Sequence, residues 1–185
     1  HFSNTRLADG NVIVLWENTP SFSDSAEEQI IYQRFSMDGT EIGSRVVVAE
    51  SNGVFSRASL ATELYNGNVV ITYKDQSSGV SDVVYQVYDP NDALISTGTL
   101  PPISANYGDA IPIALSDGGF LIASDLNDPD DSNMGFGRSF RFYSDEGVPV
   151  GDEVVVDLPR GRDVGGSLVK MGNGLIASVW RSEPE

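Results

Sequence analysis

Short runs in which apolar and polar residues alternate cover most of the chain, and turn signals separate them. Around the middle of the chain, β-rich runs flank Asn66-Gly67, and a further run, Val83–Tyr88, leads into a turn at 89–92. Asn-Gly between such runs is a strong hairpin signal, because both residues tolerate the left-handed backbone of a tight turn. No segment of ten or more residues shows the 3.6-residue period of an amphipathic helix. The pattern predicts an all-β protein.

The same pattern recurs along the chain. A glycine turn followed by a β-rich run appears at intervals of 57, 51 and 56 residues, anchored at Gly10, Gly67, Gly118 and Gly174. A second block, an aromatic strand followed by a polar turn, recurs in step with the first, at intervals of 53 and 55 residues, at Tyr32, Tyr85 and Phe140. Two blocks that repeat together indicate one structural unit used several times.

Each unit reads as four antiparallel strands, which is the plan of a propeller blade. We therefore expect a β-propeller-like array of about 3.5 four-stranded units in a single β-repeat domain, 1–185. The expected units are about 1–50, 51–100, 101–157 and an incomplete 158–185. A closed propeller has at least four blades. The sequence thus predicts a partial propeller that is completed by further chain or by another copy, or that closes in an irregular way.

The two blocks resemble a repeat found in large secreted bacterial proteins, of the type Leu-Ala-Asp-Gly-Gly-Phe-Val-Val-x-Trp followed by Tyr-x-Gln-Arg-Phe and two spaced glycines. The first unit matches it best, through Leu7, Ala8, Asp9, Gly10, Trp16, Tyr32, Gln33, Arg34, Phe35, Gly39 and Gly43. The second unit departs from it, with Asp92 and Ser96 where glycines are expected. The resemblance implies a secreted or cell-surface protein, often non-enzymatic and often accompanied by cadherin-like modules or RTX calcium-binding repeats. It carries no fixed catalytic residues.

Charge and composition narrow the function classes. The chain has 27 acidic and 11 basic residues, a formal net charge of -16, no cysteine and a single histidine, His1. This charge disfavours nucleic acid and anionic membranes as partners, and no apolar run is long enough to insert into a membrane. A buried Ser-His-Asp triad, a Cys-His pair and zinc sites made of His and Cys are excluded. The acidity favours cations, calcium above all, or serves only solubility.

One acidic run is dense enough to suggest a metal. Residues 125–133 hold four aspartates and two asparagines, and alternate positions 128, 130 and 132 follow the spacing by which a loop wraps calcium. We expect calcium as the cofactor, and the candidate ligands are Asp125, Asn127, Asp128, Asp130 and Asp131. The run lacks the central glycine and the closing glutamate of an EF-hand. The alternative is a solvated acidic loop.

The loops that follow the second strand of each unit are also acidic, and in a propeller they emerge on one rim. Trp16 and Tyr73 end second strands, beside Glu17 and Asp75. We expect these four residues to form a ligand-binding rim, because aromatic rings stack on sugars and loops on a rigid scaffold are common binding sites. The alternative is that the aromatic rings pack between units.

The sequence favours a non-enzymatic binding or structural module of a secreted or surface-attached bacterial protein, with an adhesive, glycan-binding or protein-binding role. A carbohydrate-active enzyme of glycosidase or lyase type, or a fragment of one, is the alternative, because such enzymes use paired carboxylates. An architectural spacer is a third possibility.

Overall fold

The computed structural model describes residues 2–18, 28–51, 55–75, 82–100, 110–127, 136–156, 162–172 and 175–183. Within these ranges the chain forms fourteen strands and no helix. The strands make four antiparallel sheets of four, four, four and two strands. The prediction of an all-β protein is confirmed.

Each sheet is a meander in which strands that follow one another in sequence are neighbours. The first sheet is β1 (Phe2–Arg6), β2 (Val12–Asn18), β3 (Glu28–Phe35) and β4 (Glu41–Ser51). The second is β5 (Phe55–Glu63), β6 (Val69–Asp75), β7 (Asp82–Tyr88) and β8 (Leu94–Thr99). The third is β9 (Ile111–Ala114), β10 (Phe120–Asn127), β11 (Phe136–Tyr143) and β12 (Val154–Val156). The fourth is β13 (Arg162–Lys170) and β14 (Ile176–Glu183).

The repeated glycine has a structural cause in the first hairpin of each of the first three sheets. The N–H of Leu7 donates to the Asn11 carbonyl over 2.8 Å, and the N–H of Gly10 donates to the Leu7 carbonyl over 3.0 Å. The same pair of hydrogen bonds closes the turns that begin at Leu64 and Leu115. In all three turns the glycine has a positive φ, which is the left-handed position that closes a short hairpin loop.

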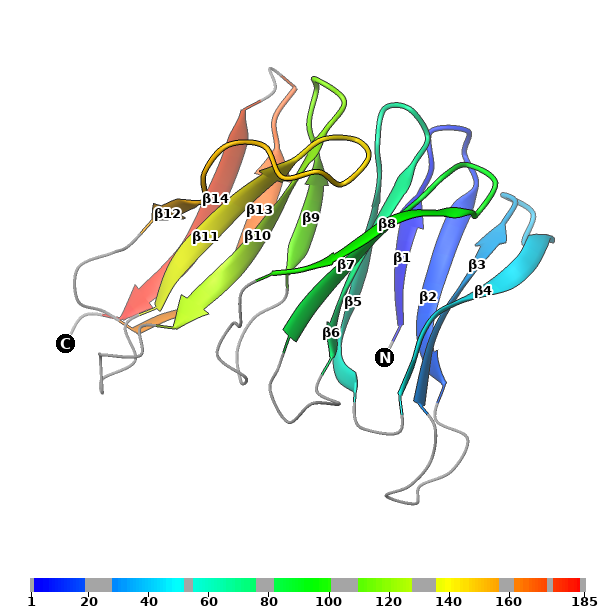
Figure 1. Ribbon diagram of the computed structural model, residues 1–185, viewed down its shortest axis with the longest axis horizontal. Helices are drawn as coiled ribbons and strands as arrows, with labels where there is room; N and C mark the ends of the chain where they lie inside the picture. The colour runs from blue at the N-terminus through cyan, green and yellow to red at the C-terminus, as the bar shows by residue number, and fades with distance from the viewer. Residues whose placement is uncertain are drawn as a thin grey trace.

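The first three sheets stack side by side in a row, and the two-stranded fourth sheet lies against the third, with β13 in contact with β11 (Figure 1). They do not close into a ring (Figure 1). The first strands of successive sheets lie next to each other, β1 beside β5 and β5 beside β9. Hydroxyl groups also link neighbouring sheets. Thr5 Oγ1 of β1 donates to the Ala61 carbonyl of β5 over 2.6 Å, and Thr72 Oγ1 of β6 donates to the carbonyl of Ala110, just before β9, over 2.7 Å.

The hydrophobic core lies in two layers between sheets. The layer between the first and second sheets contains Leu7, Ile13, Leu15, Ile30, Tyr32, Val48, Val69, Ile71, Tyr73 and Tyr88. The layer between the second and third sheets contains Leu64, Val70, Val83, Tyr85, Val87, Leu100, Ala110, Phe120, Ile122 and Tyr143. Strand β6 contributes alternate residues to both layers, so it reads as a continuous apolar run and is buried on both faces. Strand β2 is buried at every second residue.

Candidate functional site

The residues predicted to form a binding rim lie at one edge of the row of sheets. Trp16 and Glu17 are near the end of β2, Asp75 ends β6, and these strand ends lie at the same edge (lower edge in Figure 1). The ring of Trp16 is half-buried, and the guanidinium carbon of Arg45 lies 5.7 Å from its centroid. Glu17 and Asp75 are also half-buried.

Tyr73 does not offer its ring to a ligand. It is 5% exposed and belongs to the core layer between the first and second sheets. Its hydroxyl accepts a long hydrogen bond, 3.4 Å, from Nε2 of Gln86. Burial, together with the nearby carboxylate of Asp75, raises the pKa of Tyr73 to about 12. The position of Tyr73 agrees with the alternative given in the sequence analysis, in which the aromatic ring packs between units.

The predicted calcium ligands lie largely outside the described residues. This is so for Asp128, Asp130 and Asp131, whereas Asp125 and Asn127 belong to the end of β10. In the register of the hairpin, Asp125 stands opposite Arg138. In the described part of the chain, no three acidic or histidine side chains come together as metal ligands. The calcium site stays a prediction.

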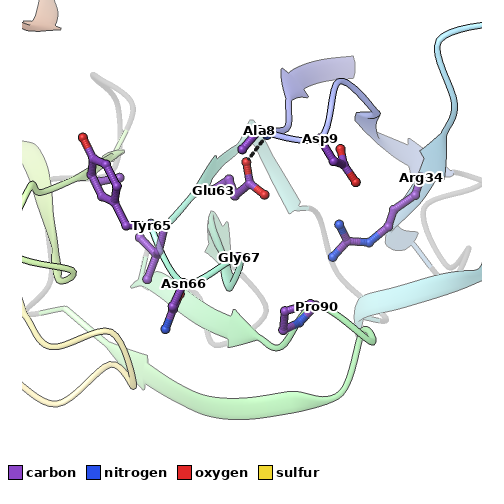
Figure 2. Close-up of a pocket in the computed structure, with 10 residues that line it drawn as sticks. Ala8, Asp9, Arg34, Glu63, Tyr65, Asn66, Gly67 and Pro90 are labelled. Atoms are coloured by element: carbon purple, nitrogen blue, oxygen red, sulfur yellow. Dashed lines mark hydrogen bonds between the residues drawn. The ribbon is translucent and has the colours of Figure 1, made fainter.

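A cavity of about 600 Å³ lies at the opposite edge, where the turns of the first two sheets meet. Its walls come from the β1–β2 turn with Asp9, the end of β5 with Glu63, the next turn with Tyr65, strand β3 with Arg34, and Pro90 of the β7–β8 turn. Figure 2 shows the side chains of Asp9, Glu63 and Arg34 directed toward the same space.

Arg34 is held in place from the second sheet. Its Nε donates to Oδ1 of Asp92 over 2.7 Å, and the hydroxyl of Tyr32 donates to the same oxygen over 2.8 Å. Tyr32 is fully buried, and burial, with the hydrogen bond to Asp92, raises the pKa of its hydroxyl well above the ordinary value. Arg34 itself is 9% exposed, and its Nη2 has no hydrogen-bond partner among the residues that the structure describes.

The two carboxylates in the cavity wall are positioned by turn N–H groups. Glu63 accepts a short hydrogen bond from the N–H of Ala8. The carboxylate of Asp9 accepts from the N–H of Asn11 over 2.9 Å and from its Nδ2 over 2.8 Å. Neither carboxylate comes within ion-pair distance of Arg34, whose one ion pair in the described chain is with Asp92. The cavity therefore separates one cation from two anions.

An exposed aromatic ring lies at the border of the cavity. Tyr65 is 67% exposed, and Nζ of Lys170, from the fourth sheet, lies 4.4 Å from its ring centroid and donates to its hydroxyl over 2.8 Å. The turn is braced from the third sheet as well, because Nδ2 of Asn66 donates to Asp145 over 3.0 Å.

Sequence reasoning missed this cavity, although it placed Arg34 and Asp9 in the repeat. In the sequence, both residues belong to the repeat pattern of the first unit, and only the stacking of the sheets brings them close to Glu63 and Pro90 of the second sheet. The available signal was Asp92, an acidic residue at a turn position where the repeat has glycine.

Comparison with known proteins adds no assignment. No family model matches the chain, and no curated protein is significantly similar to it in sequence. Among the described residues there is no helix with the length and apolarity that crossing a membrane requires.

Proposed function

We propose that this chain is a non-enzymatic binding module of a secreted or surface-attached bacterial protein, and that it holds a glycan in the cavity between its first two sheets. The observation that carries the proposal is the composition of that cavity. A guanidinium, two carboxylates held by backbone N–H groups, and an exposed tyrosine line one space of about 600 Å³. Sugar rings bind through such groups, because hydroxyls both donate and accept while the ring faces are apolar.

The rigidity of the surroundings supports the same conclusion. The cavity walls are turns that are hydrogen-bonded within their own sheet and to the next sheet, as with Ala8 to Glu63 and Arg34 to Asp92. A preformed site loses little conformational freedom on binding, which favours affinity for a polar ligand. Residues from two neighbouring units form the site, so ligand binding also depends on the stacking of the two sheets.

The test is a glycan panel containing neutral and acidic oligosaccharides, followed by isothermal titration of the glycans that are retained. We expect saturable binding that falls about tenfold in Glu63→Gln, because a charge-assisted hydrogen bond to a sugar hydroxyl is lost. Asp152→Asn, at an exposed position between β11 and β12, is the matched control and leaves binding unchanged. Absence of saturable binding across the panel, or equal binding by Glu63→Gln, would refute the proposal.

A second candidate is a carbohydrate-active enzyme, because two carboxylates, Asp9 and Glu63, face one cavity. Glycoside cleavage requires such a pair. Release of reducing sugar from a retained glycan, abolished in Glu63→Gln, would favour the enzyme. Binding without release favours the module.

The array is, in this proposal, a partial propeller. Its support is the stack of meander sheets, in which the first strands of the first three sheets are adjacent, together with a fourth sheet of only two strands. A further chain or another copy would complete it. Sedimentation velocity across a hundredfold range of concentration tests the second option, because self-completion gives a dimer or larger species as concentration rises.

Calcium binding at the end of β10 is a separate part of the proposal. Its support is the density of carboxylates in 125–131. Calcium-stripped protein should gain several degrees in Tm on adding millimolar calcium, and magnesium should not reproduce the gain, because an ion bound only by the folded state stabilises it. Asp128→Asn with Asp130→Asn should remove the gain. An unchanged Tm would show that the acidic run serves solubility.

A further inference from the structure

The cavity between the first two sheets contains a cationic group that is only partly neutralised. A guanidinium has five N–H donors, and Arg34 uses Nε for Asp92. The same Asp92 oxygen also accepts from Tyr32, so its charge is shared between two donors. Nη2 of Arg34 is buried without a partner among the described residues. A buried donor left without an acceptor is costly, and the cost is relieved when a ligand supplies one.

The guanidinium is also fixed before any ligand arrives. Asp92 holds it from the next sheet, and the buried ring of Tyr32 holds Asp92. An arginine ordered in this way presents a planar donor face at little further loss of side-chain freedom, which suits the two oxygens of a carboxylate or of a sulfate. Figure 2 shows its guanidinium end directed into the cavity, opposite Glu63.

The two carboxylates limit what can bind beside the arginine. Asp9 and Glu63 repel a free inorganic anion that enters the cavity, and they accept hydrogen bonds from hydroxyl groups. A neutral sugar donates hydrogen bonds to the two carboxylates but offers Arg34 no anionic acceptor. A molecule with one anionic group and several hydroxyls can bind the arginine and the carboxylates together. The net charge of -16 disfavours a polyanion at longer range.

We infer that the glycan bound by this cavity carries a single anionic group, a carboxylate or a sulfate ester on an acidic sugar, which pairs with Arg34 while its hydroxyls meet Asp9 and Glu63. This inference rests on the proposed function and specifies its ligand class. Arg34 is then the residue that selects acidic over neutral sugars.

The test compares glucose, glucuronic acid and glucose 6-sulfate by ligand-observed NMR on the unmodified protein. We expect both acidic sugars to bind at least tenfold more tightly than glucose, since each adds a charge-assisted hydrogen bond. The two acidic sugars distinguish carboxylate from sulfate as the preferred group. Glycine at the same concentrations checks for a zwitterion, and its binding in place of the sugars would overturn the inference.

Arg34→Lys tests the residue itself. Lysine keeps the positive charge near Asp92 but lacks the planar pair of donors, so the affinity for the preferred acidic sugar should fall about tenfold and that for glucose should not change. Arg45→Lys, at an exposed arginine of β4, is the matched control. If Arg34→Lys fails to fold, the comparison of the three sugars on the unmodified protein still tests whether the cavity prefers acidic sugars.

The possible failures are distinct. Equal binding of glucose and the acidic sugars would overturn the inference about Arg34 and leave the glycan-binding module standing. Absence of binding by all three sugars and by the whole glycan panel would overturn both.

Discussion

Asp92 shows how a single residue can depart from the repeat and acquire a role. It occupies the turn position at which the neighbouring units have Gly39 and Gly147, and among the described residues it is the one non-glycine with a positive φ, 67°. A left-handed backbone costs a side-chain-bearing residue about 1 kcal/mol. The hydrogen bonds from Arg34 and Tyr32 of the preceding sheet offset that cost.

Removing this carboxylate should therefore destabilise the protein although it relieves the backbone. We expect Asp92→Gly to lower the free energy of unfolding by about 2 kcal/mol, because the largely buried Arg34 loses its counter-ion. Urea unfolding followed by tryptophan fluorescence measures the change. Asp152→Asn serves as the surface control, and a gain in stability on Asp92→Gly would show that backbone strain outweighs the ion pair.

Residue identity also explains what the sequence could reveal about the site. The residue types of Asp9 and Arg34 were visible in the repeat, but their proximity was not. Asp9 lies in the β1–β2 turn and Arg34 on β3, and they meet Glu63 only because the first two sheets stack. The side-chain environment of Tyr73 was equally hidden. An aromatic residue near the end of a strand can face a rim or the next sheet, and here β6 is covered on both faces.

At the scale of strands and turns, the first two interfaces between sheets each place a glycine against a side chain of the next or preceding sheet. In the first interface, Gly43 of β4 lies next to Asp92. In the second, the equivalent of Gly43 is Ser96, whose Oγ donates to the Glu146 carbonyl over 2.6 Å, and the equivalent of Asp92 is Gly147. A Cβ on Gly147 would lie 2.3 Å from Oγ of Ser96. The second interface therefore needs glycine at this turn.

Two glycines with the same backbone test this directly. Gly39 and Gly147 both have a φ of 83°, but a Cβ on Gly39 meets nothing within 4 Å. Gly39→Ala should cost about 1 kcal/mol from the backbone alone. Gly147→Ala should cost about 3 kcal/mol, because contacts with Ser96 and Val87 are added. Thermal and urea unfolding of the two variants give the difference, and equal losses would mean that the neighbours move aside.

The elements themselves were largely accessible from sequence, because hairpins are local. The repeated glycine turns, and short apolar strands such as β12, depend on residues close together in the chain. Other strands differ at their ends. Strand β4 extends over Glu41–Ser51, well beyond its apolar run 46–48. Two register shifts interrupt its pairing with β3 and break the alternation of apolar and polar residues, so its full length is not visible in the sequence.

At the scale of the whole molecule, the sheets form a row in which the core lies between neighbours. The second sheet is buried on both faces, whereas the first has one core layer in the described structure. Stability in such an arrangement is approximately a sum over sheets and the interfaces between them. The order of the sheets followed from the repeat, but whether they close did not, since closure depends on the angle between sheets.

The buried tyrosines should make this stacked core sensitive to alkali. Burial raises the pKa of Tyr73 and Tyr88 to about 12 from an ordinary value of 10.0, and it also raises that of Tyr143. The unfolded chain loses these protons first. Their contribution to stability is therefore complete below pH 10 and is lost as the pH rises toward 12.

Circular dichroism and tyrosinate absorbance, followed together from pH 8 upward, measure this effect. We expect most tyrosinate to appear with unfolding. Full tyrosinate absorbance in a chain that is still folded would contradict the burial of these rings.

The small-against-large pairs between sheets also restrict how such an array can grow. If the second unit alone were duplicated in tandem, Ser96 of the first copy would meet a second Asp92 where it now meets Gly147. A Cβ at that turn position overlaps the serine oxygen, so the aspartate would clash with it. Insertion of the first unit at the same place would supply Gly39, which has room for the serine. The residues at each interface therefore restrict which unit can follow which. Lengthened versions of this protein should keep a glycine on one side of each junction between units.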